Sequence, residues 1–144
     1  MSTSSPTVIL TGASGFIGSA VLAELLQRGV PVIVLLRPDS DRWRIAGLTG
    51  YITAPFRRFD DPDLAGKLRK YQPMSFIHCA WRGVFGEERN AYYQVSENVP
   101  LTIDSVRLAA ACGCSQWIGL GSQAEYGNPN RAIDESASTR PTTI

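Results

Sequence analysis

The fold of this chain is decided near its N-terminus by the stretch Thr7-Val-Ile-Leu-Thr-Gly-Ala-Ser-Gly-Phe-Ile-Gly18. Its first residues, Thr7 to Leu10, are mostly apolar and β-branched, which is typical of a buried strand. A glycine-rich turn follows from Gly12 to Gly18. The segment from Phe16 to Arg28 then has apolar residues at helical spacing and stops at Gly29, where a helix C-terminal cap is expected. A strand, a glycine turn and a helix in this order predict the start of a β-α-β unit.

The rest of the chain alternates short apolar runs with longer segments of helical period. Further strands are expected at Val32–Leu36, weakly at 51–59, at Ser75–Cys79 and at Gln116–Leu120. Helices are expected at Arg42–Gly47, from Asp61 to Tyr71 and from Asn90 to Cys112. This alternation predicts an α/β protein with a doubly wound, mostly parallel sheet, in the strand order 3-2-1-4-5.

The long predicted helix from Asn90 to Cys112 needs one face against the core. Its apolar residues predict that this face carries Val95, Val99, Ile103, Val106, Leu108 and Ala110. Gly113 is expected to end the helix.

The composition is that of one ordinary domain with enough apolar material for a core. Of 144 residues, 44% are hydrophobic and 19% are charged, and the formal net charge is +1. This balance disfavours a nucleic-acid binder, which usually carries a basic excess. No apolar run approaches the roughly 20 residues of a membrane span, and no secretory signal is visible at the start. We expect a cytoplasmic protein with neither nucleic acid nor membrane as a partner.

The cysteines do not predict a metal site. Cys112 and Cys114 are separated by one residue, which is too close for a usual disulfide or a CxxC metal hook. The third cysteine is Cys79, and the chain has a single histidine, His78. We expect free thiols in a reducing cytoplasm and no metal.

The glycine turn has the spacing G-x-x-G-x-x-G. It is not a P-loop, because no Lys-Ser/Thr pair follows Gly18. In a dinucleotide site the first glycine allows a tight turn, the second lets a pyrophosphate approach the backbone, and the third lets the helix pack closely. The helix N-terminus offers free N–H groups to the phosphates. The predicted cofactor contacts are Gly12, Ser14, Gly15, Phe16, Ile17 and Gly18; a purely structural turn is the alternative.

The motif Thr11-Gly-Ala-Ser-Gly-Phe-Ile-Gly18 resembles the cofactor motif of the extended short-chain dehydrogenase/reductase family, whose NAD(P)-dependent members act on nucleotide sugars. Further segments resemble motifs of this family in the same order, namely Phe76–Ala80, Glu97–Val99, Gly121–Gly127 and Arg140–Ile144. The resemblance covers nearly the whole chain. It implies a Rossmann-type fold and a cofactor site that includes Cys79, Ala80 and Asn98.

The end of the second predicted strand bears on the choice of cofactor. An acid there selects NAD through the ribose 2′-hydroxyl, whereas an arginine accommodates the 2′-phosphate of NADP. This chain has Arg37 and no acid at the strand end, so we favour NADP over NAD. A solvated Arg37 and an inward-turned Asp39 are the alternatives. The adenine-contacting acid of the family falls on Asp60, or on Arg58 if the following Asp-Pro pair sets the register.

The resemblance implies a catalytic role for Ser122, which would orient the substrate oxygen. In the family a tyrosine from Y-x-x-x-K removes the hydroxyl proton while hydride moves. No tyrosine of this chain has a lysine four residues later, and the lysines are Lys67 and Lys70. The alternative for Ser122 is a capping serine. Alone, residues 1–144 are therefore expected to lack oxidoreductase activity.

We interpret the chain as part of a longer protein. Residues 1–6 are expected to be a disordered tail, residues 7–127 a dinucleotide-binding domain, and residues 128–144 a loop leading to a missing C-terminal part with the tyrosine and lysine. The parent is expected to be a homodimeric epimerase or 4-ketoreductase of nucleotide sugars. A 4,6-dehydratase ranks lower, because Ala124 stands where that group carries an acid and Glu125 is one residue off. A complete, non-catalytic NADP sensor is the other alternative.

Overall fold

The computed structural model describes residues 6–142 and contains one parallel sheet of five strands in the order β3-β2-β1-β4-β5. The strands are β1 (Thr7–Thr11), β2 (Val32–Leu36), β3 (Ile52–Pro55), β4 (Pro73–His78) and β5 (Gln116–Gly119). The predicted fold class and strand order are confirmed. Within the expected N-terminal tail, residues 1–5 lie outside the described residues, as do residues 143–144 of the expected C-terminal loop.

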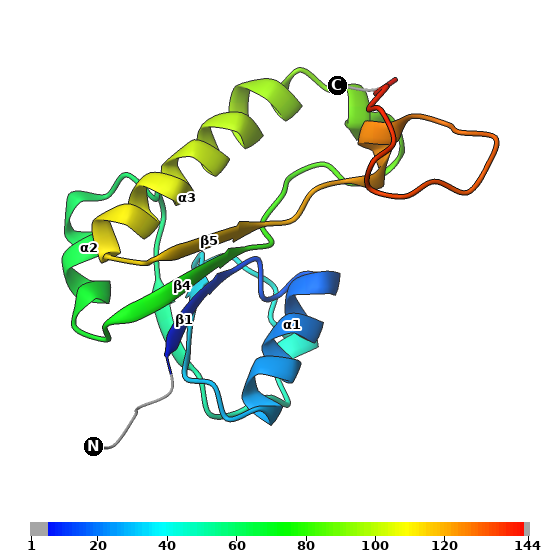
Figure 1. Ribbon diagram of the computed structural model, residues 1–144. Helices are drawn as coiled ribbons and strands as arrows, with labels where there is room; N and C mark the ends of the chain where they lie inside the picture. Colours follow the sequence, from blue (N-terminus) through cyan, green and yellow to red (C-terminus); the bar gives the residue numbers. More distant parts are fainter. Residues whose placement is uncertain (1–5, 143–144) are drawn as a thin grey trace.

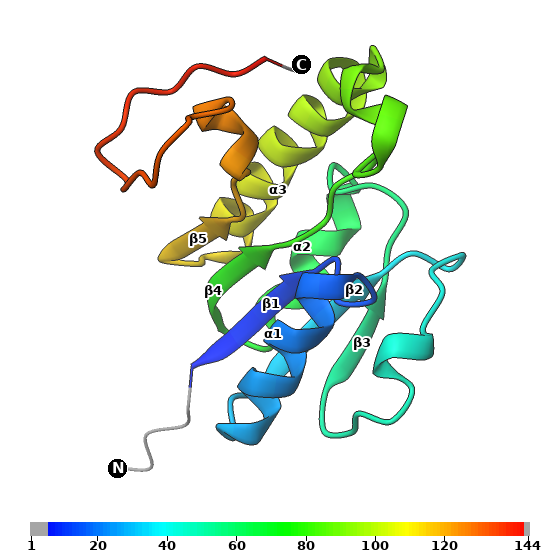
Figure 2. The ribbon, with the colours of Figure 1, turned by 90° about the vertical axis from the view of Figure 1, so that its right-hand side faces the viewer.

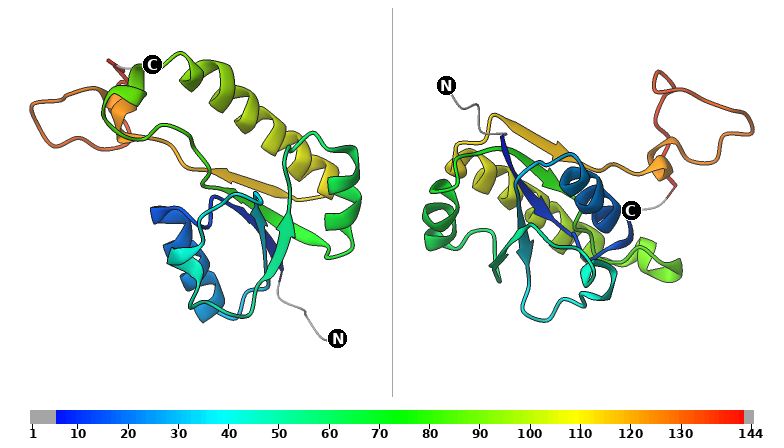
Figure 3. Two further views of the ribbon diagram at one scale, coloured as in Figure 1. Left: turned by 180° about the vertical axis from the view of Figure 1, so that it is seen from behind. Right: turned by 90° about the horizontal axis from the view of Figure 1, so that it is seen from below.

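Three α-helices cover the sheet in a three-layer arrangement, which Figure 1 and Figure 2 show from two sides. They are α1 (Phe16–Gln27), α2 (Pro62–Arg69) and α3 (Val99–Cys112). Helix α1 lies on one face of the sheet, and α2 and α3 lie on the other (Figure 3). Among residues 6–142, no helix combines the length and apolar character that a membrane crossing requires.

The strand residues alternate between two cores because successive side chains point to opposite faces of a sheet. Ile33 and Leu35 of β2 pack toward α2 and α3, whereas Val34 and Leu36 pack toward α1. All five residues of β2 are buried. A strand covered on both faces is continuously apolar, which is why β2 was readable from the sequence.

The expected core face of α3 is confirmed at Leu108 and is otherwise wrong. The buried residues of the helix are Ser105, Leu108, Ala109 and Cys112. The expected core residues that are exposed instead are Val95, Val99, Ile103, Val106 and Ala110. Small residues face the sheet and let the helix approach closely. The hydroxyl of Ser105 accepts a hydrogen bond from the indole N–H of Trp117 at 3.0 Å and donates one to the carbonyl oxygen of Thr102 at 2.7 Å.

A π-helical turn, Gln94–Asn98, precedes helix α3. The α-helix therefore begins at Val99, whereas the sequence predicted a start at Asn90. Short 3-10 helices occur at Trp43–Ile45, Gly86–Asn90 and Gln123–Tyr126. The described residues after 127 contain neither helix nor strand. The backbone N–H of Arg140 donates to the carbonyl oxygen of Glu125 at 2.8 Å, so this segment forms an excursion that returns to the last 3-10 helix (Figure 1).

Candidate functional site

The glycine turn after β1 is packed against the residues that follow β4. Gly12 has a φ of +70°, and a Cβ atom there would lie 2.5 Å from the carbonyl carbon of Cys79 and 2.6 Å from the backbone nitrogen of Ala80. No side chain fits in that space, so only glycine allows the two segments to meet. The structure therefore brings together three of the predicted cofactor contacts at the carboxyl edge of the sheet.

Gly18 holds helix α1 against the same turn. A Cβ atom on Gly18 would lie 2.1 Å from the carbonyl oxygen of Gly12. At Gly15 the added Cβ would be 3.2 Å from that oxygen, and the backbone N–H of Gly15 donates to it at 2.9 Å. The first and last glycines thus serve close packing, while the middle one lies exposed at the surface of the turn.

The N-terminus of α1 is open. Its N-cap residue is Gly15, and no side chain caps the first turn, so N–H groups are left for an external acceptor. The first two helical residues, Phe16 and Ile17, have exposed fractions of 83% and 55%. Ser14 is half-buried beside them. The uncapped amides can bind an anionic group, and the large apolar side chains beside them can pack against rings of the same ligand.

Arg37 lies directly after β2 and is exposed, with its Nε atom 3.5 Å from a carboxylate oxygen of Asp39. A pair this open and this long contributes little to stability, so the guanidinium is available to another anion. Asp60 has a different partner. Its carboxylate accepts two hydrogen bonds from Arg58 at 2.7 and 2.5 Å, and the hydrogen bonding to Arg58 lowers the pKa of the Asp60 carboxyl group.

Thr11 and His78 form a buried polar pair at the ends of β1 and β4. The Thr11 hydroxyl oxygen lies 2.8 Å from Nδ1 of His78. The imidazole packs between the rings of Phe59 and Trp117, with centroid distances of 5.8 and 6.1 Å. Burial lowers the pKa of His78 to about 4, and its Nε2 atom has no hydrogen-bond partner. The sequence had shown both residues next to predicted site motifs without pairing them.

The segment that leaves β4, residues 79–93, is here called the exit loop. Asn98 is 1% exposed, and its side-chain amide accepts from the backbone N–H of Arg82 at 3.0 Å and donates to the carbonyl oxygen of Arg82 at 2.9 Å. Gln94 is also buried and binds several other groups of the loop. The predicted contact Asn98 therefore points its amide into the protein, where it holds the exit loop.

The side chain of Arg82 is held in place as well as its backbone. Its guanidinium forms an ion pair with Glu97 and lies 4.4 Å from the ring centroid of Tyr93. The Tyr93 hydroxyl donates to a carboxylate oxygen of Glu88 at 2.7 Å. Together with Gln94 and Asn98, these contacts give the exit loop a defined shape. The role of Gln94 was not predictable, because its partners in the exit loop lie 6 to 13 residues away in a segment without periodicity.

Ser122 follows β5 and caps the 3-10 helix Gln123–Tyr126. Its hydroxyl oxygen accepts from the backbone N–H of Ala124 at 3.2 Å, which is the capping role weighed above. The side chain is exposed, so the oxygen remains open to a substrate. Glu125 lies on the same 3-10 helix, next to Ala124, and is exposed.

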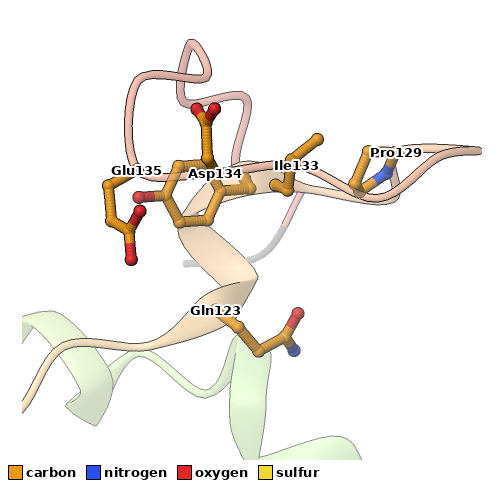
Figure 4. A pocket seen from close by; sticks show the side chains of 6 residues that line it. Gln123, Pro129, Ile133, Asp134 and Glu135 are labelled. Atoms are coloured by element: carbon orange, nitrogen blue, oxygen red, sulfur yellow. The ribbon is translucent and has the colours of Figure 1, made fainter.

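A cavity of about 400 Å³ lies between this 3-10 helix and the returning segment (Figure 4). It is lined by Gln123, Tyr126, Pro129, Ile133, Asp134 and Glu135. Burial and the neighbouring carboxylate of Glu125 raise the pKa of Tyr126. Within residues 6–142, no group of three or more His, Cys, Asp or Glu side chains could hold a metal ion.

Comparisons with known proteins show what the chain as a whole is similar to. A curated relative, UDP-glucose 4-epimerase of Homo sapiens, is 33% identical over 150 residues, covering 92% of this chain and 42% of the relative. The crystal structure of UDP-glucose-4-epimerase from Stenotrophomonas maltophila, with bound NAD and formylated UDP-arabinopyranose, superposes with a TM-score of 0.78 at 26% identity. It covers 96% of this chain and 44% of that chain.

The structure described as gox2253 is 31% identical with a TM-score of 0.74, covering 94% of this chain and 40% of that chain. The chain thus spans less than half the length of these proteins. The family model "NAD dependent epimerase/dehydratase family" matches residues 8–144. This match runs from β1 through the glycine turn to the end of the chain and confirms the resemblance inferred from the motifs: the chain belongs to the NAD dependent epimerase/dehydratase family.

Proposed function

We propose that this chain is the nicotinamide-dinucleotide-binding part of an epimerase or 4-ketoreductase that acts on a nucleotide sugar. The observation that carries the proposal is the uncapped N-terminus of α1, beside a turn where Gly12 and Gly18 leave no space for a side chain. A pyrophosphate placed there meets free amides and the positive end of the helix dipole. Two of the relatives named above, from Homo sapiens and Stenotrophomonas maltophila, are named UDP-glucose 4-epimerases, which supports the epimerase.

The residues present fit such a cofactor. The Gly12 turn would hold the pyrophosphate against the amides of the first helical residues, Phe16 and Ile17, because the Gly15 N–H already donates to Gly12. The exposed side chains of Phe16 and Ile17 would cover it. When bound, the nicotinamide supplies a site that accepts or donates hydride. Ser122 would hold the substrate hydroxyl oxygen during that transfer.

NADP is the proposed cofactor, with NAD as the alternative. Arg37 supports NADP because a guanidinium at the end of β2 suits a 2′-phosphate. NAD has support from the crystal structure of the Stenotrophomonas maltophila enzyme, which is 26% identical to this chain and contains bound NAD. The nucleotide sugar is the proposed substrate class, and a homodimer is the proposed state of the whole protein.

The chain alone is proposed to bind cofactor without turning over a sugar. Proton removal from a sugar hydroxyl requires a base, and no tyrosine here is followed four residues later by a lysine. The same absence supports the second candidate, a non-catalytic NADP sensor. A 4,6-dehydratase has less support, because Ala124 occupies the position expected for the acid.

The test is calorimetric titration of NADP+ and NAD+ into the wild-type chain and two glycine variants. Gly15→Ala places a methyl group where the pyrophosphate would approach and is expected to weaken binding by about tenfold or more. Gly66→Ala is the matched control, because an added Cβ in α2 meets nothing within 4 Å. Equal binding by all three proteins, or no binding by any, would overturn the proposal.

A further inference from the structure

We propose that Trp81 in the exit loop stacks its indole face on the nicotinamide ring, and that Gln94 is the positioning residue that fixes this indole. The inference rests on the proposed function, since it requires a dinucleotide at the glycine turn. It assigns a contact that none of the sequence motifs specified.

Trp81 lies in the exit loop, three residues after the end of β4. Cys79 and Ala80 lie against Gly12, where the pyrophosphate would sit, and Trp81 is the next residue. Arg37 marks the opposite side, because it follows β2 and β2 flanks β1 away from β4. A dinucleotide that crosses the switch point with its adenosine near β2 has its nicotinamide half near β4. Trp81 is therefore on the nicotinamide side.

The indole of Trp81 is held in one orientation by Gln94. Its Nε1–H donates to Oε1 of Gln94 at 2.9 Å. Gln94 is 5% exposed, and its Nε2 donates to the carbonyl oxygens of Gly83 at 2.6 Å and Glu88 at 2.9 Å. Oε1 also accepts from the amide of Asn98 at 2.8 Å. Three hydrogen bonds besides the one to the indole hold this buried amide in place, so the indole that it binds is held as well.

About half of Trp81 remains exposed to solvent. Trp81 has an exposed fraction of 51%, although the only polar atom of its side chain is bonded to Gln94. The surface it offers is therefore aromatic carbon, which is costly to leave in water and suited to a planar ring.

The other two tryptophans differ from Trp81. Trp117 also has its indole N–H bound inside, but its ring packs beside His78 in the core. Trp43 is 66% exposed and lies under the guanidinium of Arg44 at 4.2 Å from its ring centroid. Trp81 alone among the three combines an internally bound N–H with a half-exposed ring that has no cation over it.

The test compares cofactors with and without nicotinamide. Tryptophan fluorescence is followed while NADP+ or 2′-phospho-ADP-ribose is added, and in parallel NAD+ or ADP-ribose, with binding measured independently by calorimetry. Oxidised nicotinamide is electron-poor and quenches a stacked indole. We expect quenching by NADP+ that the nicotinamide-free compound does not produce, and we expect Trp81→Phe to abolish it. Trp43→Phe is the matched control and should keep the quenching.

The affinities give a second readout. Trp81→Ala is expected to weaken NADP+ binding by about threefold to tenfold and to leave 2′-phospho-ADP-ribose unchanged, because stacking of one ring pair is lost. Gln94→Met should have the same selective effect, since the indole is then no longer held. A purely structural role of Gln94 would instead weaken both compounds equally or alter neither, and either result would overturn its assignment.

The two proposals fail in different ways. If calorimetry shows NADP+ bound at the wild-type level in Trp81→Ala, and fluorescence does not change with NADP+, the stacking is disproved and the cofactor site stands. Quenching by UDP-glucose and not by the dinucleotide would assign Trp81 to the sugar and overturn the nicotinamide contact. If no dinucleotide binds the wild-type chain, both proposals fall.

Discussion

The hydroxyl oxygen of Thr11 lies 2.8 Å from Nδ1 of His78, and this contact joins the ends of β1 and β4 directly below the glycine turn. Both side chains are buried, Thr11 at 0% and His78 at 4% exposure. The two residues are partners in the register of β1 and β4, and Gly12 and Cys79 follow them directly. A polar contact inside the core therefore lies beside the candidate site.

The burial of the His78 imidazole makes stability depend on pH. In the folded chain the pKa of His78 is about 4, whereas the pKa of a histidine in an unfolded chain is about 6.5. Between these values the unfolded chain binds more protons, so stability is full above the upper value and falls as the pH drops. The slope is at most about 1.4 kcal/mol per pH unit.

Urea unfolding at a series of pH values across this window measures the effect. His78 is the only histidine, so His78→Gln should flatten the slope in the window whatever its effect on absolute stability. A wild-type free energy of unfolding that stays constant between the two pKa values would show that the imidazole is not buried as described.

Removal of the Thr11 hydroxyl should destabilise the chain. Thr11→Val keeps the shape of the side chain but leaves Nδ1 of His78 without a partner, in addition to Nε2. The expected cost is about 1–3 kcal/mol, measured by urea unfolding at pH 7. Thr53→Val on the exposed strand β3 is the control and should change little. An equal effect of the two substitutions would remove the special role of the pair.

The glycines of the turn should differ in their response to a methyl group. Gly18→Ala places a Cβ 2.1 Å from the carbonyl oxygen of Gly12, so backbone must move. We expect a loss of about 1–3 kcal/mol or more in the free energy of unfolding. Gly66→Ala, in an open position of α2, should gain up to about 1 kcal/mol. A stable Gly18→Ala chain would contradict the close packing of α1 on the turn.

Arg37 should discriminate between the two dinucleotides. Arg37→Ala removes the guanidinium at the end of β2 and is expected to weaken NADP+ by about tenfold to a hundredfold, the value of a charge-assisted hydrogen bond, and to leave NAD+ unchanged. Arg28→Ala, which breaks an exposed pair with Glu24 at 2.6 Å, is the control. Competition binding with both nucleotides measures the ratio, and wild-type affinities that are equal would reject the assignment to NADP.

Local patterns in the sequence predicted the sheet and the glycine turn, because a doubly covered strand such as β2 is continuously apolar and three glycines at fixed spacing constrain the backbone. The face of α3 was not predictable. That helix carries apolar residues on two sides, and its buried side includes Ser105, whose hydroxyl bonds Trp117 of another element. A contact of this kind leaves no mark in the period of the helix. The hold of Gln94 on the exit loop likewise depends on contacts between segments that have no shared period.

The central claim is that a dinucleotide pyrophosphate binds at the N-terminus of α1, and amide chemical shifts of a 15N-labelled chain test it directly. On addition of 2′-phospho-ADP-ribose, the account predicts that the largest shift changes fall on the turn and first helical residues, from Gly12 to Gly18, with Gly66 unmoved. Saturable binding whose shift changes lie elsewhere, with this segment unaffected, would contradict it.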